Sequence, residues 1–414
     1  MRVASAAHSC VRVTWYDGEP SCVCCSGVPV SRPALLGGSP VRSHEHSWPV
    51  SDDGVRDVFE RLAATGEWGQ YLGPHCDALR ERLAADMTHP SASPPHVRLC
   101  SGGTAAIWLA LIACRVTSGD EVLLAAYDFK ANLANIRELG ATPVLVDVRP
   151  DDAQLDVDQL DAARTNATRA IIVSHLHGGS VQMPPVRDWA DRHGVAVIED
   201  ICQNPLAGVD GRPAGCWGDV AALSFGGSKT LSAGRGGAVV MADDAMAARL
   251  TRFAERGNDV SPLSEMQAAV LLPQFDALPE RAATRRRGAA WIGDRVASLG
   301  LRLFDSRRES CSPDYYKVGF WYDDDAWDGL SRERLCEAMH AEGITLSPGF
   351  PSLQTTHAKR TFRTVGDLPH AAAAGRQIVG LHHPVLLDEP HGWQQVVDAL
   401  TKLHAARTLL REAG

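Results

Sequence analysis

Short apolar segments alternate with amphipathic segments through the middle of the chain, and this alternation is the strongest constraint on its fold. The apolar runs are rich in β-branched residues and occupy 121–126, 142–148, 169–176, 195–200, 220–225 and 237–243. Between several of them lie segments with helical spacing of apolar residues, at 131–139, 157–164 and 186–194. Continuous apolar strands separated by helices are typical of a mostly parallel sheet covered on both faces, so the pattern predicts an α/β fold.

The flanking segments predict the domain organisation. Helical spacing also occurs over 54–68, 76–87 and 104–115, and the last of these is apolar all round, which is typical of a buried helix. A helical region from 264 to about 299, with breaks expected at Pro273 and Pro279, leads to a strand over 315–323 and helices over 331–344 and 392–410. We therefore expect a poorly ordered extension (1–45), a large α/β domain (46–262), and a linker helix with a small C-terminal α+β domain (263–414).

Charge and composition narrow the class of partner. The chain has 414 residues, and its 41 basic and 50 acidic residues give a formal net charge of −9. An acidic chain has no general attraction for polyanions, so we expect neither nucleic acid nor an anionic membrane as a partner. No apolar run approaches the roughly 18 residues that span a bilayer. The N-terminal stretch is a poor signal peptide, and several of the 11 cysteines lie in apolar runs, so we expect a cytoplasmic protein.

Cysteines are dense near the N-terminus. Cys10, Cys22, Cys24 and Cys25 lie within the expected extension. A tetrahedral zinc site usually needs a second pair of ligands at a defined spacing, and none follows. We therefore expect no metal.

Three sequence features lie where an α/β sheet binds its ligand, at the carboxyl ends of its strands. Gly102, Gly103 and Thr104 precede a helix and predict an anion site at its N-terminus. Asp200 follows Glu199 at the end of an apolar strand. Lys229 lies in a glycine-rich loop, where a partly desolvated amine can attack carbonyl groups. Taken singly, these features are more typical of a turn with a helix cap, a strand end and a solvated surface lysine.

Together the three features fit one cofactor, pyridoxal 5′-phosphate (PLP). Its aldehyde would bond to Lys229, its pyridine nitrogen would be protonated opposite Asp200, and its phosphate would lie at the helix N-terminus. An aromatic residue should stack on its ring, and Tyr127 and Phe129 follow a predicted strand.

At this point the chain resembles the DegT/DnrJ/StrS family of fold type I PLP-dependent sugar and aminocyclitol aminotransferases. The segments that carry the resemblance, spread over about residues 31–410, are SGGTAAIWL, AAYDF, VDVRPDDAQLD, VSHLHGG, EDICQ and LSFGGSK. The resemblance implies that Lys229 forms the Schiff base and Asp200 pairs with the pyridine nitrogen. Its implied cofactor contacts are Gly103, Thr104, Phe129, Gln203 and Ser224, and His177 is a candidate substrate contact.

Other motifs resemble the branch of the family that transfers amino groups from L-glutamine to scyllo-inosose. The sequence departs from the family where an Asn of one subunit reaches the phosphate of the other, because Val260 occupies that position. Asn258 is the candidate replacement in a homodimer with shared active sites. Pro262 replaces a family Arg, and Arg235 lies where the family commonly has Glu. Arg235 either holds the carboxylate of the amino donor or braces its loop against an acid such as Asp219.

The resemblance implies an aminotransferase that moves an amino group from glutamine or glutamate to a keto-cyclitol or keto-sugar in secondary metabolism. Two alternatives stay open. One is a PLP-dependent aromatase or dehydratase of the amino-dehydroquinate type, although the family's dehydratases replace the lysine by histidine. The other is a PLP-binding homologue without turnover, which a complete set of Lys229, Asp200, Gln203 and Ser224 disfavours.

Overall fold

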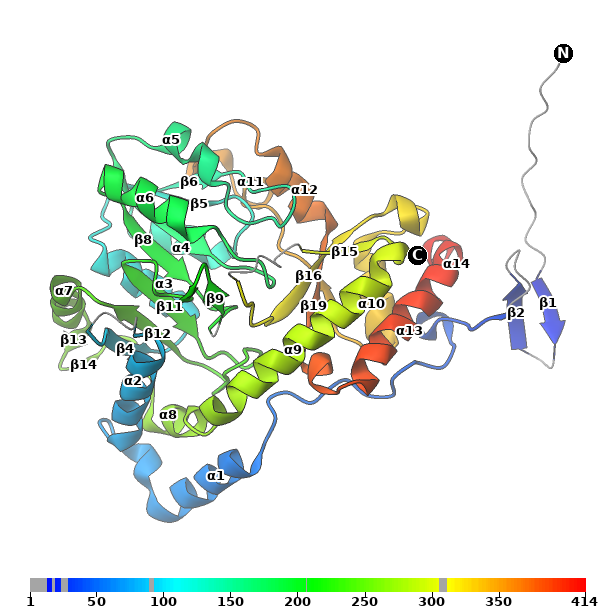
Figure 1. The fold of residues 1–414 in the computed structure, drawn as a ribbon, viewed down its shortest axis with the longest axis horizontal. Coiled ribbons are helices and arrows are strands. Elements are labelled where there is room, and N and C mark those ends of the chain that lie inside the picture. The colour runs from blue at the N-terminus through cyan, green and yellow to red at the C-terminus, as the bar shows by residue number, and fades with distance from the viewer. Residues whose placement is uncertain (1–12, 17–18, 24–28, 89–92, 206, 305–310) are drawn as a thin grey trace.

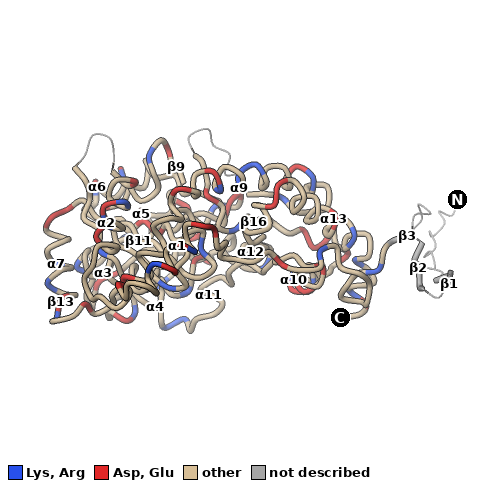
Figure 2. The backbone as a smooth tube through the Cα atoms, turned by 90° about the horizontal axis from the view of Figure 1, so that it is seen from below, with Lys and Arg blue, Asp and Glu red and all other residues tan. Residues whose placement is uncertain are grey.

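Two sheets organise the chain, and the long helix between them links two hydrophobic cores (Figure 1). The computed structural model describes residues 13–16, 19–23, 29–88, 93–205, 207–304 and 311–414. Basic and acidic residues are interspersed along the backbone of both parts (Figure 2). No helix in these residues is long and apolar enough to cross a membrane.

The large sheet has the predicted α/β character. Its strand order is β18-β6-β5-β7-β8-β11-β12-β4, and only β12 runs against its neighbours. The central strands are buried at nearly every position, because helices cover both faces. The strands are β4 (His96–Cys100), β5 (Glu121–Ala125), β6 (Thr142–Val146), β7 (Thr168–Ser174), β8 (Ala196–Asp200), β11 (Val220–Ser224), β12 (Gly237–Met241) and β18 (Arg363–Thr364).

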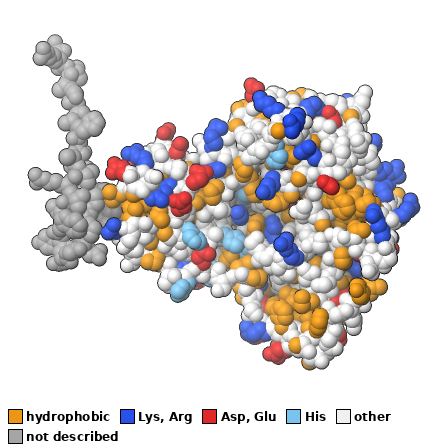
Figure 3. Space-filling model, turned by 180° about the vertical axis from the view of Figure 1, so that it is seen from behind, with side chains coloured by type: hydrophobic (Ala, Val, Ile, Leu, Met, Phe, Trp, Pro, Cys, Tyr) orange, Lys and Arg blue, Asp and Glu red, His pale blue; other side chains and the backbone are white. Residues whose placement is uncertain are grey.

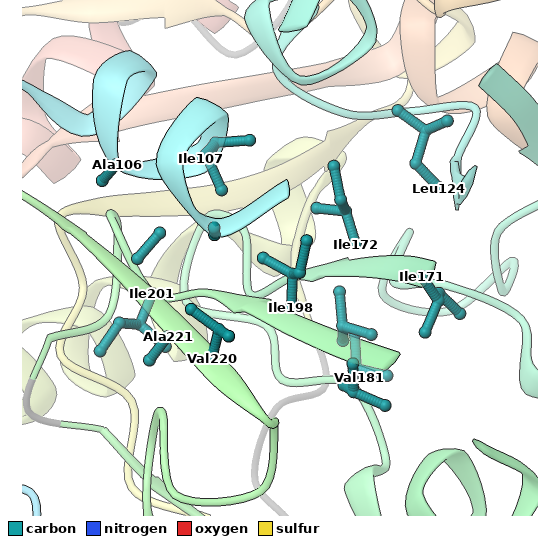
Figure 4. Close-up of a cluster of buried hydrophobic side chains, with 14 of the residues drawn as sticks. Ala106, Ile107, Leu124, Ile171, Ile172, Val181, Ile198, Ile201, Val220 and Ala221 are labelled. Atoms are coloured by element: carbon teal, nitrogen blue, oxygen red, sulfur yellow. The ribbon is translucent and has the colours of Figure 1, made fainter. Parts of the chain in front are cut away.

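Helix α3 (Gly103–Ala113) is the buried helix that the sequence predicts. Ala106 and Ile107 on its buried side face Ile198 of β8 and Val220 of β11 in the core of the large sheet (Figure 4). The other helices of this part are α1 (Asp53–Thr65), α2 (Pro74–Asp86), α4 (Lys130–Glu138), α5 (Leu160–Ala163), α6 (Met183–His193) and α7 (Asp244–Ala254). Short pairs β9 (Gly208–Val209) with β10 (Arg212–Pro213) and β13 (Glu255–Arg256) with β14 (Asn258–Asp259) lie at its edges.

The linker breaks at one of its two prolines. Helix α8 (Glu265–Leu271) ends before Pro273, which caps the long helix α9 (Gln274–Val296), whereas Pro279 lies inside α9 without ending it. Pro279 is in the second turn of α9, where its missing N–H removes one intrahelical hydrogen bond, yet the helix continues past it.

The small sheet is antiparallel, with the order β15-β16-β19-β17. Its strands are β15 (Leu301–Leu303), β16 (Lys317–Tyr322), β17 (Leu346–Pro348) and β19 (Ile378–His382). The helices of this part are α10 (Arg332–Ala341), α11 (Leu353–Thr356), α12 (Pro369–Gln377), α13 (His391–Ala405) and α14 (Arg407–Glu412). Strand β18 lies in this part of the sequence but pairs with β6 of the large sheet.

Part of the expected N-terminal extension is bound to the small domain. The backbone N–H groups of Ala34 and Val41 each donate to a carboxylate oxygen of buried Glu342, at 2.9 Å. Further upstream, β1 (Val13–Tyr16), β2 (Glu19–Val23) and β3 (Pro29–Val30) pair with one another. The domain boundaries at 45 and 262 stay predictions.

Candidate active site

A cavity of about 670 Å³ lies at the carboxyl ends of the parallel strands, between the two parts of the chain. Most of the residues expected at the cofactor contribute to its wall. Those that line it are Gly103, Thr104, Phe129, Asp200, Gln203, Ser224, Lys229 and Arg235. The fold thus brings together residues that are up to 132 positions apart in the sequence (235 − 103 = 132).

The N-terminus of α3 forms one end of the cavity. Gly102 is the N-cap residue and Gly103 the first residue of the helix, and both line the cavity. A Cβ atom at Gly103 would lie 2.8 Å from Cβ of Ser224 and 3.0 Å from Sγ of Cys202, so only glycine fits there. The unpaired N–H groups of the first helical turn and the helix dipole make this end suitable for a phosphate.

The end of β8 places one carboxylate in the cavity and its neighbour outside it. Asp200 lines the cavity and is nearly buried; its Oδ1 accepts a hydrogen bond from Cys202 N at 3.0 Å. Because adjacent strand residues point to opposite faces, Glu199 instead accepts the backbone N–H groups of Gly215, Trp217 and Gly218. Only Asp200 is therefore available to a ligand.

A buried polar network behind Asp200 was not predicted from the sequence. Asn132 donates from Nδ2 to Oδ2 of Asp200 at 3.1 Å and to Oδ1 of Asp128 at 3.2 Å, while Ser174 Oγ donates to Oδ2 of Asp128 at 2.9 Å. Burial, together with the nearby charge of Asp200, raises the pKa of Asp128 to about 8. Asp128 is thus expected to be protonated at neutral pH, which leaves Asp200 as the negative charge of the network.

Lys229 also lines the cavity and is half-buried. Its backbone carbonyl accepts a hydrogen bond from Nε1 of Trp48 at 3.0 Å, which fixes the loop. Its Nζ lies 4.0 Å from the centre of the Tyr316 ring, and the Tyr316 hydroxyl is 2.9 Å from Oγ of Ser228. Trp48 therefore holds the backbone of the loop, and the amine lies over the Tyr316 ring.

Gln203 has one end bound and one end available. Its Oε1 accepts the backbone N–H of His177 at 3.0 Å, and no described residue is hydrogen-bonded to its Nε2. Phe129 is 41% exposed on the cavity wall, with its ring 5.8 Å from that of Phe350. An amide donor and an aromatic face are what a flat ligand with a polar oxygen requires.

The structure does not bring the His177 side chain to the cavity wall. His177 is fully buried, and its Nε2 lies 3.1 Å from the hydroxyl of Tyr127, which in turn accepts Phe350 N. Burial, with Lys317 and Lys229 nearby, lowers the pKa of His177 to about 3, so it is neutral. In this chain His177 supports Tyr127 and Phe350 beneath the cavity.

Arg235 and Asn258 differ in position. Arg235 is exposed on the cavity wall, and Asp219, the acid considered for it, pairs instead with Arg187 at 3.0 Å. Asn258 lies on the β13–β14 hairpin and does not line the cavity of its own chain.

The small domain closes the cavity with residues that no motif singled out. Tyr316 and Lys317 come from the start of β16, and Phe350 follows β17. Only the alternating pattern of 315–323 could have marked this strand, and it does not reveal which end faces the large sheet.

No group of three or more His, Cys, Asp or Glu side chains in the described residues could hold a metal ion. Cys10, Cys24 and Cys25 lie outside those residues, and of Cys22 only the backbone is described.

These features define the class of protein. The sheet order places the helix N-terminus with Ser224, the strand-end Asp200 and the loop Lys229 around one cavity at the carboxyl ends of the strands, where α/β proteins bind their ligands.

Comparison with known proteins supplies the family. The family model described as the DegT/DnrJ/EryC1/StrS aminotransferase family matches residues 55–401. The chain therefore belongs to this family, and it is an enzyme that transfers amino groups.

Two curated relatives and one solved structure illustrate the similarity. The chain is 32% identical to an L-glutamine:2-deoxy-scyllo-inosose aminotransferase from Streptoalloteichus tenebrarius, over 89% of this chain and 97% of that one. It is 31% identical to an enzyme of the same name from Streptomyces kanamyceticus, over 92% and 98%. The crystal structure of DesI in the presence of its TDP-sugar product superposes with a TM-score of 0.77, at 28% identity, over 92% of this chain and 97% of that one.

Proposed function

We propose that this enzyme uses PLP to transfer an amino group from L-glutamine or L-glutamate to a keto-cyclitol or keto-sugar. The observation that carries the proposal is the single cavity that Asp200, Lys229 and the N-terminus of α3 line together. The names of the aminocyclitol relatives support the class of donor and acceptor.

The residues of the cavity fit this cofactor. The first turn of α3 and Ser224 would hold the phosphate. Gly103 has no side chain, so the backbone N–H groups of this turn can lie close to Ser224 and to the phosphate. Asp200 would hold the proton of the pyridine nitrogen, and the free amide nitrogen of Gln203 would donate to the ring oxygen. Phe129 would stack on the ring.

The bound cofactor would supply an electron sink that stabilises negative charge at the α-carbon of the donor. Asp200 would keep this sink effective by remaining ionised, while Asn132 and the backbone of Cys202 hold its two oxygens in place. Nζ of Lys229 would attach the cofactor and, once released, would move the proton from the donor α-carbon as a general base.

The enzyme would work as a homodimer with shared active sites. Apolar side chains are exposed around α1 and α8, including Phe59, Met266, Tyr71 and Leu72. Figure 3 shows hydrophobic side chains gathered on the lower lobe of the molecule. Apolar surface of this kind is typical of a protein–protein interface. Asn258, which lies outside its own cavity, would then face the cavity of the partner. Light scattering should show a dimer, which Phe59→Asp should weaken.

A spectroscopic screen tests the proposed reaction. Single amino acids added to the cofactor-loaded protein should change its absorbance only when they are donors, with L-glutamine or L-glutamate among them. Adding keto-cyclitols or keto-sugars should then restore the spectrum only with true acceptors. If no amino acid changes the spectrum, the proposed function is wrong.

A further inference from the structure

The cavity holds a second lysine that the proposed chemistry leaves without a role. Lys317 lines the same cavity as Lys229. Besides burial, the charges of both lysines lower the pKa of His177, and the charge of Lys229 lowers the pKa of Lys317. Burial is the main reason why the pKa of Lys317 is lowered, and the nearby Lys229 adds to it.

The side chain of Lys317 is held in one direction by the small sheet. It starts on β16 and passes over Gly380 of β19, where a Cβ atom would lie 3.3 Å from Cδ of the lysine. Its Nζ then donates to Oγ of Ser347 on β17, at 2.9 Å. The methylene chain therefore crosses a neighbouring strand, and the glycine provides the room.

The ammonium group of Lys317 has no anionic partner among the described residues. An ammonium group carries three donors, and Ser347 accepts one of them. Its register partner across the sheet is His382, whose pKa is lowered mainly by burial, so that side chain is neutral. The carboxylates that line the cavity, Asp200 and Glu138, come from the large domain. A half-buried cation with two free donors is a site for an anion.

We infer that Lys317 binds the carboxylate of the amino-acid donor in the transfer reaction proposed above. Ser347 orients the ammonium group, and the cavity places it on the same side as Lys229, whose amine must reach the donor α-carbon. Arg235, which also lines the cavity, is exposed to solvent, so its attraction for a carboxylate is more strongly screened. The inference rests on the proposed function.

Kinetics of Lys317→Gln test the inference, with Lys359→Gln as the matched control on the exposed surface. Loss of one charge-assisted hydrogen bond should raise the donor KM roughly 10- to 150-fold. The acceptor KM and the affinity for PLP should stay unchanged, as should all constants of Lys359→Gln. A rise in the acceptor KM alone, or in the Kd for PLP, would overturn the inference by assigning Lys317 to another anion. A rise in the donor KM of Arg235→Lys but not of Lys317→Gln would also overturn it.

A substrate that lacks the carboxylate makes the test sharper. 4-Aminobutanamide is L-glutamine without its α-carboxylate. The wild-type enzyme should discriminate strongly between the two amines, and Lys317→Gln should lose most of this discrimination without further loss toward 4-aminobutanamide. Equal discrimination in both enzymes would contradict a contact between Lys317 and the carboxylate.

Calorimetry separates this inference from the proposed function, because it needs no turnover. Glutarate should bind to the cofactor-loaded wild-type protein, with a Kd that is roughly 10- to 150-fold higher in Lys317→Gln. No binding to the wild type, or equal binding to both proteins, would overturn the inference even if amino transfer is observed. Should Lys317→Gln not fold, Ser347→Ala decides, since loss of the orienting hydroxyl should weaken glutarate binding severalfold.

Discussion

The two walls of the cavity differ in the elements that form them and in the contacts that hold their side chains. The wall formed by the large sheet consists of strand ends and a helix N-terminus, and its side chains are locked into a buried hydrogen-bond network around Asp200. The other wall combines the Lys229 loop with Tyr316 and Lys317 of the small domain, and its contacts are cation–aromatic and single hydrogen bonds. The first wall is suited to hold the ring and phosphate of a cofactor, whereas the second presents Lys229, which would attach the cofactor, beside groups that would meet exchanging substrates.

This difference predicts that the largest effect of a single substitution on the reaction rate comes from the wall formed by the large sheet, which we call the locked wall. Asp200→Asn removes the charge opposite the expected ring nitrogen while keeping the size of the side chain. Breaking one side of a buried ion pair costs about 3–5 kcal/mol, so the reaction with the amino donor should slow by a few hundred- to a few thousand-fold. Stopped-flow absorbance after addition of donor measures this rate. Near-normal rates in Asp200→Asn, matching an Asp188→Asn surface control, would show that another group holds the proton.

A smaller effect is expected where the locked wall is packed most tightly. In Gly103→Ala the new methyl group would meet Ser224 and Cys202 at the start of α3. Overpacking of this kind costs about 1–3 kcal/mol, so thermal stability and PLP affinity should both fall. Gly102→Ala is the control for stability, because no atom lies within 4 Å of a Cβ there and its φ of 172° is extended. Equal melting temperatures for the two variants would refute the close packing at Gly103.

The third effect is on stability alone, depends on pH, and concerns Asp128, which lies behind Asp200. The pKa of its carboxyl group rises from about 3.8 in the unfolded chain to about 8 in the folded protein. The folded state therefore binds a proton that the unfolded state lacks, and stability is lost as the pH rises between these values.

Asp128→Asn should remove that loss. The variant should gain stability over the wild type as the pH rises from about 4 to about 8, at up to about 1.4 kcal/mol for each pH unit, and the gain should level off above pH 8. Denaturant unfolding at several pH values measures the difference. A difference that does not vary with pH would mean that Asp128 is ionised in the folded protein.

The two walls also differ in how well the sequence predicts them. The place of Asp200 was predictable because parallel strands bring their carboxyl ends to one edge, and that of Gly103 because two glycines directly precede the helical pattern. Ser224 came only from the family resemblance. Lys229 followed from its loop and its motif. The strand alternation likewise predicted the order of elements in the large domain.

The other wall depends on tertiary packing. Tyr316 and Lys317 face the cavity only because α9 and the small sheet return to the large domain, and nothing in 315–323 specifies that direction. His177 matched a family position, yet its side chain packs beneath Phe350 because its buried neighbours leave it no path to the cavity. The Asp128–Asn132 pair was missed because its hydrogen bonds reach distant residues, Ser174 at the end of β7 and Asp200 at the end of β8.

The most direct test of the account is to locate the lysine that carries PLP. Two lysines line the cavity, Lys229 on the loop after β11 and Lys317 on β16. The cofactor-loaded protein should be yellow, and borohydride reduction followed by digestion and mass spectrometry should find the pyridoxyl group on Lys229 alone. A pyridoxyl group on Lys317, with Lys229 unmodified, would contradict the roles assigned to both walls.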